Sequence, residues 1–97
     1  MYARSGTLYP RAKDYDRALT TLRETVVLAA ERQPGFAGFV VLANREELKI
    51  IGITLWNTKA DMLASEEGEY LQEQISRILI LLKRPPEFES FEVHTIS

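Results

Sequence analysis

Two apolar stretches separated by a short polar break dominate the centre of the chain. Phe36–Ala43 and Leu48–Trp56 are rich in β-branched and aromatic residues, and the break between them, Asn44–Glu47, is polar and charged. Such a pattern is typical of two antiparallel strands joined by a tight loop. The sequence therefore predicts a β-hairpin over residues 36–56.

Neither face of the second arm of this hairpin carries a charge after Lys49. One face carries three branched aliphatic side chains, those of Ile51, Ile53 and Leu55. The other carries large apolar side chains with smaller residues between them, namely Ile50, Gly52, Thr54 and Trp56. An antiparallel sheet with one solvated face alternates apolar and polar residues, so we expect this sheet to need a cover on both faces.

A strand and a long amphipathic helix are expected before the hairpin. Met1–Leu8 has the mixed Tyr, Thr and Leu content of a strand, which Pro10 cannot continue. Behind Asp14, a candidate N-cap, apolar residues recur at helical spacing at Tyr15, Leu19, Leu22 and Val26. Pro34 disfavours helical geometry in the residue before it, so this helix should end near Gln33.

Two helices and a strand are expected after the hairpin. Thr58, followed three residues later by Asp61, forms a weak capping box for a short helix over Lys59–Ser65. Glu69–Lys83 has a wide apolar stripe at helical spacing and ends before a pair of prolines. Phe88–Ile96 alternates in the manner of a strand.

The order of these elements predicts an α+β protein with a ferredoxin-like βαββαβ sheet and its helices on one face. Right-handed crossovers place both helical segments on the same side, where we expect them to cover Ile51, Ile53 and Leu55. If Ala43 pairs with Leu48, the uncovered face then holds Val41 opposite Ile50 and Phe39 opposite Gly52, in addition to the other residues of that parity.

An apolar patch of this size is uncommon on a soluble monomer. We therefore predict that a second copy of the sheet covers it, in a homodimer with a two-fold axis.

Composition narrows the remaining possibilities. The 97 residues predict a single domain over 1–97, and a net charge of −2 with interspersed signs gives no field that attracts nucleic acid or an anionic membrane. The chain has no cysteine, no zinc-type spacing and no phosphate-binding glycine loop, so we expect no metal site. It also lacks an apolar run of the length that a signal peptide or membrane span requires, which favours a cytoplasmic location.

At the level of motifs, the chain resembles the antibiotic biosynthesis monooxygenase-like group of dimeric α+β barrel proteins. The resemblance rests on the order of elements, on Pro34–Phe36 opening a strand, and on Ile53–Trp56 closing the next strand before Asn57–Lys59 and a short helix. It covers nearly the whole chain. It implies two protomers whose sheets face each other as a barrel, with a pocket between each sheet and its helices or inside the barrel mouth.

Characterised members of this group include cofactor-free oxygenases of polyphenolic compounds and haem-degrading enzymes. The pocket tryptophan of the oxygenases matches Trp56, whereas their pocket asparagine falls on Gly52 and their pocket tyrosine on Met62. The haem-degrading members need an asparagine in the first strand, a second tryptophan and a histidine in the long helix. Trp56 is the only tryptophan here, and the only histidine, His94, lies in the last predicted strand, which argues against haem degradation of that kind.

Each candidate site residue has a structural alternative. Trp56 is either a flat wall for an aromatic ligand or a core residue, and Gly52 leaves room either for a ligand or for the ring of Phe39. His94 has the one side chain with an ordinary pKa near neutrality, so it is the candidate catalytic base unless it is a solvated strand-end residue. Tyr70 and Arg77 either reach the mouth of a pocket or lie on the helix surface.

Two functions follow from these residues. The first is a cofactor-independent monooxygenase that acts on a small aromatic or phenolic compound, with Trp56, Gly52, Phe39, Met62, Tyr70 and Arg77 as substrate-binding residues. The second is a non-catalytic dimer of the same fold that binds a small molecule or has a structural role. No cofactor is expected in either case.

Overall fold

The structure, a computed structural model, describes the whole chain from Met1 to Ser97. Its elements, in chain order, are β1 (Tyr2–Leu8), a 3₁₀ turn η1 (Ala12–Asp14), α1 (Tyr15–Thr21), a π-helical turn η2 (Leu22–Val26), α2 (Val27–Glu31), β2 (Phe36–Asn44), β3 (Lys49–Trp56), α3 (Lys59–Glu67), α4 (Glu69–Leu79) and β4 (Glu87–Glu92). The segments α1, η2 and α2 follow one another directly and form one continuous helical segment, as the sequence predicts.

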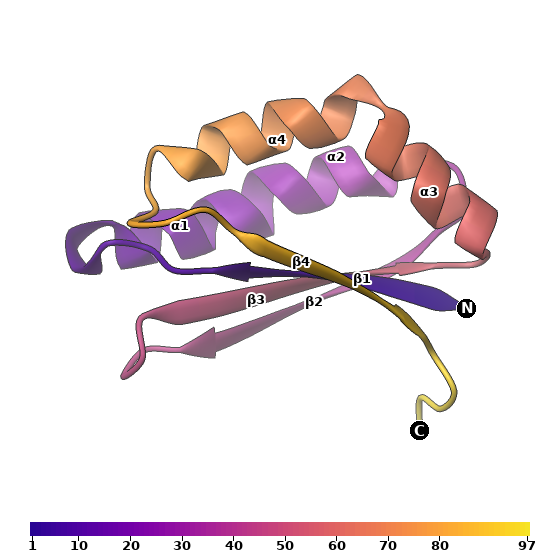
Figure 1. Ribbon diagram of the computed structural model, residues 1–97, viewed down its shortest axis with the longest axis horizontal. Coiled ribbons are helices and arrows are strands. Elements are labelled where there is room, and N and C mark those ends of the chain that lie inside the picture. Colours follow the sequence, from indigo (N-terminus) through magenta and orange to yellow (C-terminus); the bar gives the residue numbers. More distant parts are fainter.

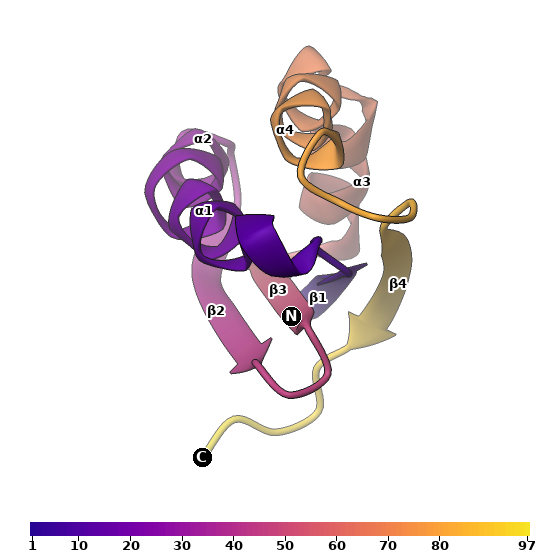
Figure 2. The same ribbon diagram turned by 90° about the vertical axis from the view of Figure 1, so that its left-hand side faces the viewer.

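The strands form one antiparallel sheet in the order β2-β3-β1-β4. All of the helices lie on the same side of this sheet, as Figures 1 and 2 show. The predicted ferredoxin-like α+β fold is therefore confirmed. None of the helices is both long and apolar enough to cross a membrane.

The helices cover the face of the sheet that holds Ile50 and Trp56, so the expectation that they cover Ile51, Ile53 and Leu55 is wrong. Ile50 and Trp56 are both 0% exposed. Ile50 belongs to the same apolar core as side chains from both helical segments, which include Tyr15, Ala18, Leu22 and Ile78. Strand parity separates the two faces correctly, but both faces are apolar along β3, so parity in that strand alone does not determine which one the helices cover.

The opposite face, which we call the open face, has no cover within the chain. It carries seven apolar side chains, those of Ala3, Val40, Leu42, Ile51, Ile53, Leu55 and Phe91. Val40 is 41% exposed, Leu42 48% and Phe91 45%. The apolar residues concentrate on β2 and β3, because β1 presents Ser5 and Thr7 on this side. The structure thus has an unpartnered apolar face, although not the one predicted.

The hairpin register differs from the predicted one by two residues. Ala43 pairs with Ile50 rather than with Leu48, and Phe39 pairs with Thr54 rather than with Gly52. The shift arises because Leu48 lies in the turn with φ of 50°, and its N–H donates to the carbonyl of Arg45. A shift of two residues keeps every side chain on its face.

Two elements end earlier than predicted. Helix α4 ends at Leu79, four residues before the predicted Lys83, because Leu81 and Leu82 turn inward and are only 3% and 8% exposed. The N–H of Lys83 then donates to the carbonyl of Tyr9, which holds this segment beside the end of β1. Strand β4 ends at Glu92 rather than at Ile96.

Of the two predicted N-caps, Asp14 and Thr58, only Thr58 caps its helix with its side chain. Asp14 makes no side-chain cap hydrogen bond; its carboxylate accepts from Arg11 Nε at 3.0 Å. Thr58 is the N-cap of the helix after the hairpin, as predicted, because its Oγ1 accepts from the N–H of Asp61 at 3.0 Å; the Asp61 carboxylate accepts from the Thr58 hydroxyl at 2.8 Å rather than from its backbone N–H, so the predicted capping box forms only in part. Gly35 lies against this cap with φ of 79°, and its carbonyl accepts from the N–H of Asn57 at 2.8 Å.

Replacing Gly35 with alanine is expected to destabilise the protein. A Cβ at this position would lie 2.2 Å from the carboxylate carbon of Asp61, and a positive φ costs a non-glycine residue roughly 1–2 kcal/mol. We predict that Gly35→Ala lowers the free energy of unfolding by about 2 kcal/mol or more. Urea unfolding monitored by circular dichroism measures this loss.

Gly68→Ala is the matched control, since Gly68 has φ of −77° and a Cβ there would have no neighbour closer than 3.7 Å. Equal stability of the two variants would contradict the steric and backbone argument at Gly35.

Candidate functional site

A cavity of about 90 Å³ lies between the helix-covered face of the sheet and the segments η2 and α4. Most of its wall is aliphatic or aromatic, including Leu8, Leu22, Val26, Phe39, Leu71, Ile75, Ile78 and Phe88. Five polar side chains complete the wall, those of Arg4, Thr54, Ser65, Tyr70 and Gln74. An apolar enclosure with a few polar groups is typical of a small-molecule site.

Two adjacent glycines explain why the cavity forms at this point. Gly6 on β1 pairs directly with Gly52 on β3, so neighbouring strands lack side chains on the covered face. A Cβ at Gly52 would lie 3.2 Å from Leu22 Cδ2 and 3.6 Å from Phe39 Cζ. Gly52 therefore lets Phe39 and Leu22 approach the strand, and their side chains form the cavity wall beside it.

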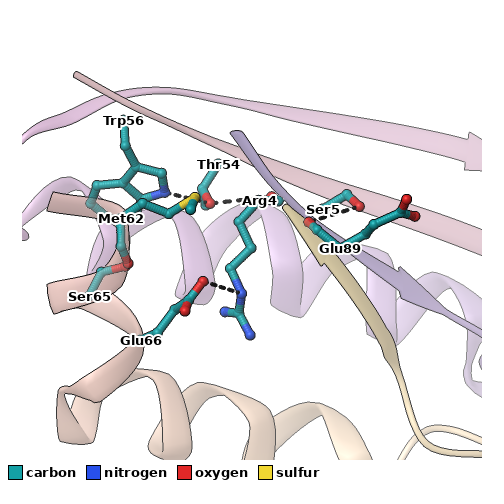
Figure 3. A network of polar contacts seen from close by, with 8 residues as sticks. All are labelled: Arg4, Ser5, Thr54, Trp56, Met62, Ser65, Glu66 and Glu89. Carbon is teal, nitrogen blue, oxygen red and sulfur yellow. Dashed lines mark hydrogen bonds and ion pairs between the residues drawn. The ribbon is translucent and has the colours of Figure 1, made fainter. Parts of the chain in front are cut away.

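Arg4 is the cationic group of the cavity. Its Nε lies 3.1 Å from Glu66 Oε1, and its guanidinium carbon lies 4.3 Å from the centre of the Phe88 ring. Figure 3 shows the side chain extending from β1 toward Glu66 on α3. Burial lowers the pKa of Arg4, and the negative charge of Glu66 opposes this effect. The guanidinium remains charged at neutral pH and has further N–H donors.

Tyr70 places a neutral hydroxyl in the same cavity. Burial raises the pKa of Tyr70, an effect that the Ser65 hydroxyl and the positive charge of Arg4 oppose. The phenol therefore stays protonated at neutral pH and can donate a hydrogen bond. Arg4 and Tyr70 together give one region of the wall two kinds of donor suited to an anionic oxygen.

Gln74 supplies the opposite kind of group. The residue lines the cavity and is 7% exposed, and its Oε1 is buried without a hydrogen-bond partner. An enclosed acceptor without a donor is unusual in folded proteins.

Trp56 and Met62 are core residues rather than cavity residues. Trp56 is 0% exposed and Met62 is 2% exposed. The Trp56 ring packs edge-on against Phe36 at 5.9 Å, and its Nε1 donates to Thr54 Oγ1 at 2.9 Å (Figure 3). Trp56 therefore influences the cavity through Thr54, which lines it.

Arg77 and His94 also lie outside the cavity. Arg77 pairs with Glu73 at 3.3 Å and lines an outer groove between the segment η2–α2 and α4, which shares Tyr70 and Gln74 with the cavity. His94 has an 83% exposed side chain, and its Nε2 lies 3.0 Å from Glu92 Oε1. It belongs to the C-terminal segment, which leaves the sheet on the side opposite the helices (Figure 1). Of the residues predicted to bind substrate, the structure brings Phe39, Gly52 and Tyr70 together.

Four polar residues of the cavity were not predicted from the sequence, namely Arg4, Thr54, Ser65 and Gln74. Arg4 is the one charged residue of the first strand, which is a signal that sequence reasoning could have used. Gln74 lies three residues after Leu71 and four before Ile78, so it is a polar residue on the apolar stripe of its helix. Nothing in the sequence around Thr54 marks it as a cavity residue, because threonine is common in strands.

Three solved structures have folds similar to that of this chain. The monooxygenase from the gene ActVA-Orf6 of Streptomyces coelicolor, solved with nanaomycin D, superposes with a TM-score of 0.83 at 12% identity, over 99% of this chain and 89% of the other. SnoaB, a cofactor-independent oxygenase from Streptomyces nogalater, gives a TM-score of 0.75 at 12% identity, over 98% and 94% of the two chains. Rv0793 from Mycobacterium tuberculosis gives a TM-score of 0.78 at 12% identity, over 99% of this chain and 97% of the other.

The chain has the fold of the antibiotic biosynthesis monooxygenases. The resemblance inferred from its sequence motifs is thus confirmed at the level of structure. No protein-family model matches the sequence, and no curated protein matches it either.

Within this monooxygenase fold, Thr54 is expected to support Trp56 by accepting its hydrogen bond. Thr54→Val leaves the buried indole N–H without an acceptor, which costs about 1–3 kcal/mol, whereas Thr54→Ser keeps the hydroxyl. We predict that the valine variant is the less stable of the two by about 1 kcal/mol or more. Urea unfolding followed by the fluorescence of the single tryptophan measures the difference. A valine variant as stable as the serine variant would contradict this role of Thr54.

Proposed function

We propose that the chain is a cofactor-independent monooxygenase that binds a small phenolic compound in the cavity between the sheet and the helices. The observation that carries this proposal is the pairing of an apolar enclosure with the two donors Arg4 and Tyr70. The likeness to solved oxygenases supports it at the level of fold.

The cavity residues suit the first requirement of such a reaction, which is to ionise a phenol away from water. The positive charge of Arg4 lowers the pKa of a phenol bound beside it. The Tyr70 hydroxyl can donate a hydrogen bond to the resulting phenolate oxygen. The ligand can therefore give its proton to bulk water as it enters and bind as the phenolate, without a basic side chain in the cavity.

The apolar wall suits the second requirement, which is to hold the anion where dioxygen can take an electron from it. Phe39 and Phe88 offer aromatic surfaces to a ring, and the aliphatic residues of η2 and α4 exclude water. Exclusion of water strengthens the interaction between the phenolate and Arg4. In this account Trp56 positions Thr54 and does not contact the substrate.

We further propose that the functional unit is a homodimer in which a second copy covers the open face. Burying a side chain of the size of Val40, Leu42 or Phe91 is worth roughly 1.5–3 kcal/mol, and these side chains are between 41% and 48% exposed in the protomer. Val40 pairs with Ile53 and Leu42 with Ile51, which gives a contiguous patch that suits a self-complementary interface.

The alternative function is a dimer of the same fold that binds a small molecule without transforming it. The exposure of His94 favours this alternative, because the only histidine of the chain, the predicted catalytic base, lies outside the cavity in the protomer. The two functions share the ligand site and differ in whether dioxygen is consumed.

Oxygen consumption separates the two functions. We expect the wild-type protein to consume oxygen with at least one member of a panel of phenols and hydroxyquinones. Tyr70→Phe, which removes a single hydroxyl, is expected to lower the turnover number by about 10²-fold, as the loss of one oxyanion donor typically does.

Tyr9→Phe is the matched control, because the Tyr9 hydroxyl donates to Glu87 at 2.7 Å and the residue lies outside the cavity. Thermal stabilisation by a panel compound without oxygen uptake would support the binding function instead. Turnover that Tyr70→Phe leaves unchanged would contradict the proposed role of Tyr70.

A further inference from the structure

The buried amide of Gln74 limits the kind of ligand that the cavity can accept. Gln74 lies on the stripe of α4 that packs toward the sheet, between the cavity residues Leu71 and Ile78. Its Oε1 is the one buried side-chain polar atom of the protein without a hydrogen-bond partner. Leaving a buried acceptor unpaired destabilises a folded protein, so a bound donor would remove this cost.

The volume of the cavity limits the size of the ligand. The space of about 90 Å³ is smaller than the cavity of about 150 Å³ that holds benzene in an engineered protein. A single aromatic ring therefore more than fills this space and has to reach toward the outer groove, which shares Tyr70 and Gln74 with the cavity. A fused ring system would have to extend past Tyr70 and Gln74 into the outer groove.

The polar groups of the wall require two different oxygens from such a ligand. Arg4 and Tyr70 donate hydrogen bonds and so suit an ionised oxygen, whereas Gln74 Oε1 accepts one and so suits a neutral hydroxyl. A ligand with a single oxygen leaves one of these requirements unmet. A ring with two hydroxyl groups meets both.

We propose that Gln74 is a specificity-determining residue that selects single-ring aromatic compounds with two hydroxyl groups, one ionised beside Arg4 and Tyr70 and one donating to Gln74 Oε1. This inference rests on the proposed function of the cavity as a phenol site. It goes further in assigning the substrate class and the residue that recognises the second hydroxyl. A site built to bind a hydroxyl strongly disfavours the analogue that lacks it, because its own polar group then stays unpaired.

The test compares each dihydroxybenzene isomer with the cresol in which a methyl group replaces the second hydroxyl. Binding to the full-length protein is measured by calorimetry without oxygen, so that turnover plays no part. We expect one dihydroxybenzene isomer to bind the wild type at least about tenfold more tightly than its cresol partner. In Gln74→Leu the preference should disappear or reverse.

Gln72→Leu is the matched control, because Gln72 lies on the same helix and is exposed. It should keep the wild-type preference. The melting temperature gives a second readout: Gln74→Leu should raise it in the absence of ligand, since the substitution removes an unpaired buried acceptor. A Gln74→Leu protein that is stabilised but keeps the wild-type ligand preference would overturn the proposal, because the acceptor would then be a packing defect.

The outcomes distinguish this inference from the monooxygenase proposal. A Gln74-dependent preference without oxygen uptake would support the ligand class and overturn the reaction. Equal oxygen uptake with dihydroxybenzenes and cresols would support the reaction and overturn the role of Gln74. Binding of none of these compounds would overturn the role of Gln74, while oxygen uptake with the hydroxyquinones would still decide the reaction.

Discussion

The structure depends on one constraint: its sheet is apolar on both faces, and the chain has helices for only one of them. Ile50 and Trp56 are completely buried beneath the helices, while Val40, Leu42 and Phe91 remain between 41% and 48% exposed on the other side. The hydrophobic effect that stabilises the core therefore also acts on the open face. Under the proposed dimer, the same sheet serves as the floor of a ligand cavity on one side and as an interface on the other.

The cavity is a local exception to close packing on the covered face. Paired glycines on β1 and β3 carry no side chains there, and the cavity beside them is lined by Arg4 and Gln74, which make no hydrogen bond to each other. Arg4 is held by Glu66 at 3.1 Å, yet it has further donors, and Gln74 has an acceptor without a donor. Polar groups left unpaired among apolar residues are costly to a folded protein, which is the physical reason for interpreting this region as a site.

The sequence was sufficient to predict the fold, because hydrophobic periodicity and the prolines mark most of the elements. It predicted the two faces of β3 but not which face the helices cover. The first strand gives a mixed signal, since Ser5 and Thr7 share the open face with Ile51 and Ile53, whereas Leu8 and the charged Arg4 share the covered face with Ile50.

The candidate site was harder to predict than the fold, because its residues come from distant segments. Gly52, Phe39 and Tyr70 were identified, but Arg4 and Gln74 meet only when β1 and α4 pack on either side of the cavity. Trp56 was assigned to the pocket through the family resemblance, whereas its complete burial and its bond to Thr54 make it a supporting residue. His94 follows the last strand and is solvated, a placement that its neighbours in the sequence do not reveal.

Sedimentation equilibrium at micromolar concentration tests the central claim most directly. The account predicts a particle of twice the chain mass of 11.1 kDa for the wild type and for Ile80→Glu, which adds a charge at a residue that is 64% exposed away from the sheet. Leu42→Glu, which places the same charge on the open face, should dissociate the particle into subunits. A well-folded wild-type monomer of 11.1 kDa would contradict the account, because the open face would then be stable in water without a partner.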